Sequence, residues 1–157
     1  MRCLRKYLGN RRGQAMTESA LVFIPLVMMV FGVIDSSLAL WVRSTLDHAA
    51  RAGVRYGITY QTRSGMGHDD SIKAEVVANS TGLLQPSDVT VAFYAGSNPS
   101  TAITSGGNIP GNIVVVTAER DWNWVTRMVF RGGTIHLRST SADVMEGLGA
   151  GQTPPTR

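Results

Sequence analysis

The sequence contains a single cysteine, Cys3, among its 157 residues. Because the chain has no second thiol, it forms no internal disulfide, and no thiolate metal site or cysteine nucleophile lies beyond residue 3. A lipoprotein would carry its cysteine after an apolar stretch, whereas Cys3 precedes the apolar stretch of this chain. The sequence therefore excludes disulfide-stapled scaffolds and lipid-modified anchors.

Acidic residues are missing from the first 12 positions, which contain five cations: Arg2, Arg5, Lys6, Arg11 and Arg12. The rest of the chain has all 11 acidic residues and the other ten cations, so its net charge is −1. The overall charge of +4 is thus a property of a short leader and not of a phosphate-binding surface. We expect no nucleic-acid partner.

The sequence motifs of common enzymes are also missing. The chain has no G-x-S-x-G, no phosphate-binding loop and no H-E-x-x-H. The three histidines, His48, His68 and His136, fall in three separate predicted elements. Asp69 and Asp70 follow His68, but adjacent residues need distant partners to complete a metal site, and an aspartate that caps a helix near residues 71–80 is the favoured interpretation. We predict a protein that is not an enzyme, with no catalytic residues, metal or cofactor.

A long apolar run covers residues 20–42 and is interrupted by Asp35, Ser36 and Ser37. As a helix it would be about 35 Å long, enough to cross a hydrocarbon core of ~30 Å. The cationic leader favours a cytoplasmic N-terminus. A secretory signal peptide is the alternative, although its apolar region usually spans about 7–15 residues and ends in small residues. We predict one transmembrane helix over residues 14–42.

Two carboxylates accompany the apolar run. Glu18 stands at its front edge, where a helix dipole favours negative charge. Asp35 lies about 10 Å from the outer end of the span. A carboxylate within a membrane helix is a functional candidate, and a hydrated acid near the outer headgroups is the alternative for Asp35.

The segment from Gly13 to Gly57 resembles the N-terminus of the TadE-like pseudopilins of tight-adherence (type IVc, Flp) pili. It begins GQAMTESALVFIP, with a glycine after a basic leader, a glutamate at the fifth following position and a proline in the first half of the span. An aspartate near the end of the span and the stretch AARAGVRY complete the similarity. Ser19 departs from the pattern, which usually has an aromatic or bulky apolar residue there.

The resemblance implies that a prepilin peptidase removes the basic leader, residues 1–13, by cutting between Gly13 and Gln14 on the cytoplasmic side. It implies that Glu18 is an assembly residue that pairs with the new N-terminal amine of a neighbouring subunit. Asp35 is then a candidate contact between helices. The expected location is the bacterial inner membrane, with the N-terminus cytoplasmic and the head periplasmic, or extracellular in a pilus.

The function implied by the resemblance is that of a minor pseudopilin in tight-adherence pilus biogenesis and surface attachment. The implied partners are the prepilin peptidase, the inner-membrane assembly platform, other pilins or pseudopilins, and membrane lipid. A permanently anchored single-pass protein with a periplasmic binding head is the alternative.

Residues 43–146 are predicted to form the helix extension and an α+β head. Leu46, Ala49, Ala50, Gly53, Val54, Gly57 and Ile58 follow the spacing of an amphipathic helix. Their small side chains suit close packing, on a sheet of the same chain or on other subunits. The fold expected is pilin-like: a long N-terminal helix packed on a small antiparallel sheet, with one or two short helices.

Strand-like runs cover residues 88–94, 112–118 and 134–141. Residues 95–111 are predicted to form a long exposed loop. Trp122, Trp124, Val125, Met128 and Val129 suggest a short helical turn, and residues 147–157 read as a disordered tail.

Overall fold

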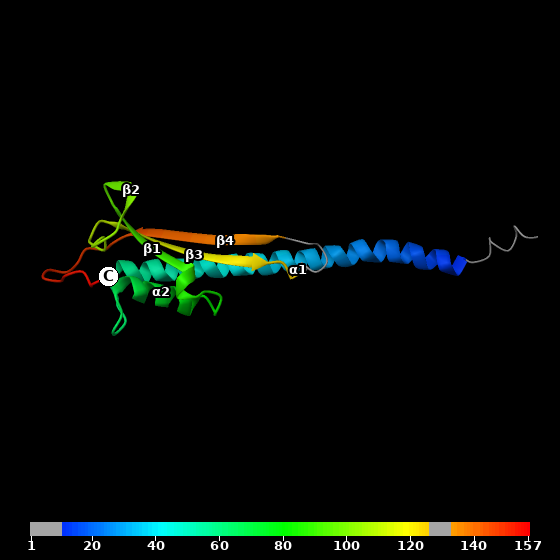
Figure 1. Ribbon diagram of the computed structural model, residues 1–157, viewed down its shortest axis with the longest axis horizontal. Coiled ribbons are helices and arrows are strands. Elements are labelled where there is room, and N and C mark those ends of the chain that lie inside the picture. The colour runs from blue at the N-terminus through cyan, green and yellow to red at the C-terminus, as the bar shows by residue number, and fades with distance from the viewer. Residues whose placement is uncertain (1–10, 126–132) are drawn as a thin grey trace, which may run out of the picture.

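The computed structural model describes residues 11–125 and 133–157, without the side chains of Arg11 and Arg12. Helix α1, Arg11–Ile58, runs the length of the described molecule, and its N-terminal half projects beyond all other elements (Figure 1). A short helix α2, His68–Asn79, and a four-stranded antiparallel sheet gather on its C-terminal half. The predicted α+β, pilin-like fold is confirmed.

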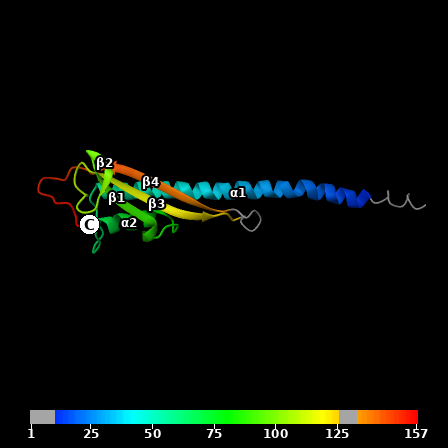
Figure 2. The same cartoon turned by 45° about the horizontal axis from the view of Figure 1, so that its top comes forward.

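The sheet has the strand order β2-β1-β3-β4. Strand β1 covers Val89–Ala95, β2 Asn98–Ile103, β3 Ile113–Asn123 and β4 Thr134–Val144, and a 3-10 turn, η2, precedes β1 at Pro86–Asp88. Strands β3 and β4 pair along their whole length, whereas β1 pairs with β3 only as far as Val89 opposite Ala118. The far end of the β3–β4 pair therefore extends alone beside α1, toward its projecting half (Figure 2).

The hydrophobic core lies between one face of the sheet and the two helices. Its sheet residues are Val89 and Phe93 from β1 and Val114, Val116 and Ala118 from β3, which alternate along each strand. The predicted stripe of α1 faces this core, with every member buried except the half-buried Ile58. The stripe is thus covered by the chain's own sheet and α2.

Close packing of α1 on α2 explains why the stripe is small-sided. A Cβ atom added at Gly53 would lie 2.3 Å from Cγ2 of Val76, and one at Gly57 would lie 2.9 Å from Cδ1 of Ile72. Both distances are far below van der Waals contact. Glycine at these positions lets the two helices approach.

Three local predictions are wrong. The expected loop over residues 95–111 contains β2, an edge strand whose side chains are almost all exposed and which tolerates Pro99. Trp122 lies in β3 and not in a helical turn, because the strand alternation continues to Asn123; Met128 and Val129 lie outside the described residues. Helix α2 has Gly67 and no aspartate at its N-cap.

The C-terminal residues contact the head, contrary to the expected disordered tail. The guanidinium of Arg157 donates hydrogen bonds of 2.9–3.1 Å to the Asp69 carboxylate and lies 4.5 Å from the centre of the Phe93 ring. The Thr156 carbonyl accepts a 2.8 Å bond from the His68 N–H. A long-range ion pair of this kind leaves no periodic pattern in a sequence rich in glycine and proline.

Candidate functional site

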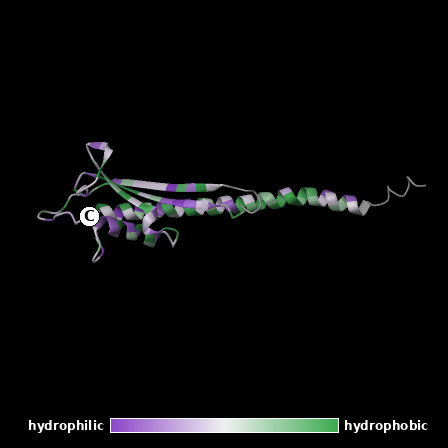
Figure 3. Ribbon diagram, viewed as in Figure 1, coloured by the Kyte–Doolittle hydropathy of each residue, from purple (hydrophilic) through white to green (hydrophobic). Residues whose placement is uncertain are grey.

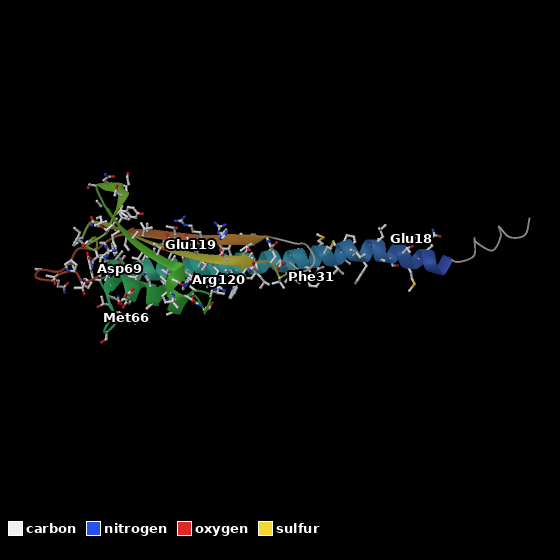
Figure 4. The ribbon with its side chains drawn as sticks, viewed as in Figure 1. Glu18, Phe31, Met66, Asp69, Glu119 and Arg120 are labelled. Carbon is white, nitrogen blue, oxygen red and sulfur yellow. The ribbon has the colours of Figure 1, made fainter. Side chains whose placement is uncertain are left out.

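The predicted processing and assembly residues lie at the start of α1. Gly13, Gln14 and Glu18 are all exposed, and the Gln14 amide lies 3.4 Å from the Glu18 carboxylate. The Thr17 hydroxyl donates to the Gln14 carbonyl at 2.8 Å. Figure 4 shows Glu18 near the end of α1 that points away from the head. Glu18 is therefore free of the head and accessible to another subunit.

A collar of exposed apolar side chains begins at Met16 and continues beyond Glu18 on all sides of α1. It consists of Met16, Leu21, Val22, Phe23, Ile24, Leu26, Met28, Met29, Val30, Phe31, Val33 and Ile34, with 39–79% of each residue exposed. Figure 3 shows the same stretch as the most continuous apolar part of the molecule. Within the described residues, α1 is the one helix long and apolar enough to cross a membrane.

The polar residues near the end of the collar satisfy their hydrogen bonds within the chain. The Ser36 hydroxyl donates to the Gly32 carbonyl and the Ser37 hydroxyl to the Val33 carbonyl, both at 2.8 Å. Bonds of this type reduce the cost of placing a hydroxyl in an apolar medium. The two serines are thus compatible with a helix in lipid.

Asp35 is where the head first covers α1. The residue is 1% exposed, and its Oδ1 accepts a 3.0 Å hydrogen bond from the Val125 N–H, just beyond the end of β3. The predicted contact between helices of different subunits stays a prediction, but the carboxylate already has a contact inside its own chain. Sequence alone gave no sign of this contact, since it joins residues 90 positions apart.

A second carboxylate of α1 fixes the helix against β4. Asp47 accepts a hydrogen bond from the Ser139 hydroxyl, and Ser139 is buried. Asp35 and Asp47 lie on the side of α1 that the β3–β4 pair covers. Two charge-assisted hydrogen bonds therefore fix the position of the sheet along the helix.

The distal end of the head is built around His68, which is fully buried. Its Nε2 lies 3.1 Å from the Gly57 carbonyl and its Nδ1 lies 3.4 Å from the Asn108 amide, while its ring stacks between Tyr60 and Phe93. Burial lowers the pKa of His68 because the charged ring would lose its hydration. This cluster joins α1, α2 and the chain end, and its role is structural.

The outward face of the sheet carries pairs of polar and charged side chains. Glu119 opposes Arg138 at 3.2 Å, and Asp121 contacts His136, on neighbouring positions of β3 and β4. These side chains line a hollow beside η2. Within residues 11–125 and 133–157, no three side chains with metal-binding groups gather.

The comparison with protein families finds a match, and it lies in the N-terminal helix. Residues 13–55 match the family described as TadE-like protein. This segment of the chain is similar to TadE-like proteins. No curated protein and no solved structure matches it. The TadE-like segment and the exposed collar together fit a membrane protein associated with pili.

The TadE-like match begins at Gly13 and ends at Arg55. It therefore lies wholly within α1 and contains the four predicted site residues, Gly13, Gln14, Glu18 and Asp35. The four strands and α2 lie outside it. The first part of the TadE-like segment is the exposed apolar collar, and its last part, from Val42 to Val54, is packed under the head.

Proposed function

We propose that this chain is a minor pseudopilin of a tight-adherence pilus. A prepilin peptidase would remove residues 1–13, and the trimmed chain would enter pilus assembly through its helix and contribute to attachment. It acts as a substrate and a structural subunit, with no reaction of its own.

One observation carries this proposal: α1 presents Gly13 and Glu18 at the free end of an apolar collar that the head leaves uncovered. A helix that served as a soluble core would bury that surface. A lipid bilayer or a bundle of similar helices would cover the collar equally well, because each provides an apolar environment as long as the collar. A subunit that moves from membrane to filament needs a rod of this kind.

Glu18 supports the assembly role by its position. After a cut behind Gly13, the amine of Gln14 would lie about 6 Å of helix rise from Glu18. In an apolar bundle an unpaired carboxylate is costly, so it favours the one axial position where it meets an amine. We propose the amine of a neighbouring subunit as its partner, at the membrane assembly platform.

The mass of the protein recovered from cells tests the proposal. We expect the mature chain to begin at Gln14, and Gly13→Val to retain its leader. Gly9→Val is the matched control, because it changes a glycine of the same leader and should be cut normally. A native chain that still begins at Met1 would instead indicate a permanently anchored single-pass protein with a binding head.

A second variant separates processing from assembly. Glu18→Ala should be cut at Gln14 yet be absent from sheared pili, whereas Glu18→Asp should keep part of the assembly. If Glu18→Ala assembles normally, the carboxylate has no role in register.

A further inference from the structure

The end of the β3–β4 pair lies beside α1 at the level of the apolar collar. Because the Val125 N–H bonds to Asp35, this end lies at the level of Asp35 along the helix. Phe31 and Ile34, within one turn of Asp35, are about half exposed on the collar. The head thus reaches the apolar surface without a neck between them (Figures 1 and 4).

The opposite side of α1 stays apolar further along the helix than the side that the head covers. Leu40 and Trp41 are 67% and 53% exposed, although the buried residues Asp35 and Val42 flank them. Tryptophan is enriched in the interfacial layer of a membrane. Trp41 lies six residues beyond Asp35, about 9 Å further out along the helix axis, so with Asp35 at the inner edge of the outer headgroups Trp41 lies near their outer edge.

We propose that the end of the β3–β4 pair is a second membrane-contacting element, seated in the outer headgroup layer. The element is defined by Trp124 and Val125 with Thr134 at the start of β4. This proposal depends on the membrane span of the proposed function. The ligand of the element is the phospholipid surface beside the chain's own helix.

The side chains at this end suit that layer. Val125 is 65% exposed and Trp124 is half-buried, whereas Trp122 packs against the hydrophobic core. An apolar side chain beside an amphipathic aromatic ring is the composition of an interfacial anchor. Such an exposed valine gains free energy when lipid covers it.

Backbone and side-chain polar groups at this end make hydrogen bonds within the chain, which suits a medium poor in water. Asn123 pairs with Thr134 across the strands, and the Thr134 hydroxyl donates to the Asn123 side chain at 2.9 Å. Further along the chain, the Val125 N–H donates a hydrogen bond to the Asp35 carboxylate. An unpaired donor would resist entry into an apolar layer, so Asp35 makes contact with lipid less costly.

Charged residues limit the depth of this contact. Asp121 and His136 face each other two pairs before the last pair of the strands, with side chains 64% and 81% exposed. At about 3.4 Å per residue they lie roughly 7 Å from the end. Exposed charge is not tolerated in hydrocarbon, so the element stops in the headgroups and does not insert fully.

Quenching by nitroxide lipids tests this element in the full chain. Cys3→Ser removes the native thiol, and Val125→Cys then carries an environment-sensitive fluorophore in phosphatidylcholine–phosphatidylglycerol vesicles. We expect about a twofold loss of emission with nitroxide near the headgroup and a smaller loss with nitroxide at the chain end. Thr134→Cys, on the other strand, is a second probe should the first variant fail to fold.

Two further positions separate the outcomes. A probe at Val30, within the collar, should be quenched best by the deep nitroxide, and a probe at Thr101 in β2 by neither. Quenching at Val30 with none at Val125 and Thr134 would overturn the interfacial element and leave the membrane span intact. The same result would be obtained if a second copy of the chain, and not lipid, covered both probes, and it would equally overturn the interfacial element. No quenching at Val30 would overturn the span and the proposed function together.

Discussion

Asp35 and Val125 lie 90 positions apart in the chain and are joined by a 3.0 Å hydrogen bond from the Val125 N–H to the carboxylate. The bond closes the head onto α1 at the end of the exposed collar. It gives the one acidic residue of the apolar run a partner within its own chain. If the collar spans a membrane, as proposed, the level at which the head meets that membrane is set by a contact within the chain.

Replacing Asp35 should loosen the end of the β3–β4 pair. Asp35→Ala leaves the Val125 N–H without its acceptor, at a cost of about 1–3 kcal/mol in the stability of that contact. Hydrogen–deuterium exchange should become faster near Val125. Asp35→Asn keeps an acceptor oxygen and should exchange more nearly as the native chain does. Equal exchange in all three proteins would show that the bond does not hold the head.

Gly53 should not tolerate a side chain. Gly53→Ala places a Cβ against Val76, and overpacking of this kind costs about 1–3 kcal/mol. Denaturant unfolding of the full chain in detergent measures the loss. Gly32→Ala is the matched control, since its Cβ meets nothing within 4 Å, and the double variant Gly53→Ala/Val76→Ala should recover part of the loss. A stable Gly53→Ala would contradict the close approach of α1 and α2.

The stability of the head should decrease as the pH falls below 6.5, the ordinary pKa of histidine. Burial lowers the pKa of His68 in the folded state, so the unfolded chain takes up the proton first. Protonation then favours unfolding, by at most about 1.4 kcal/mol per pH unit for one proton. The loss continues until the pH passes the lowered, folded pKa.

His68→Gln tests this dependence, because glutamine can still donate to the Gly57 carbonyl but does not titrate. Asp69 and Arg157, which also face the ring, stay in place and act on its charge in opposite directions. The variant should be less stable overall, with a flatter pH profile between 7 and 5. An unchanged slope would assign the pH dependence to another group.

Arg157 should couple to Asp69 more strongly than an exposed pair does. Their side chains are 18% and 23% exposed, and a double-mutant cycle with alanine should give about 0.5–3 kcal/mol. The pair Arg138–Glu119, with 67% and 60% exposed, is the control and should give less than about 1 kcal/mol. Similar values for both cycles would mean that the Arg157–Asp69 pair is no stronger than an exposed ion pair.

Much of this protein could be predicted from sequence where a pattern repeats. The apolar spacing from Leu46 to Ile58 indicated the buried side of α1, because a helix returns to the same side every three or four residues. Alternation in the same way indicated β1, β3 and β4. Strand β2 was missed because an exposed edge strand with Pro99 carries no apolar alternation.

The sequence by itself determined the charged leader, the apolar run, Glu18 at its front and the resemblance to TadE-like proteins, since each depends on neighbouring residues and on composition. The tertiary structure decided what Asp35, Asp47 and Asp69 contact. Their partners Val125, Ser139 and Arg157 come from distant parts of the chain. Such pairs arise when the sheet and the chain end pack against the helices, and the spacing of neighbouring residues does not predict this packing.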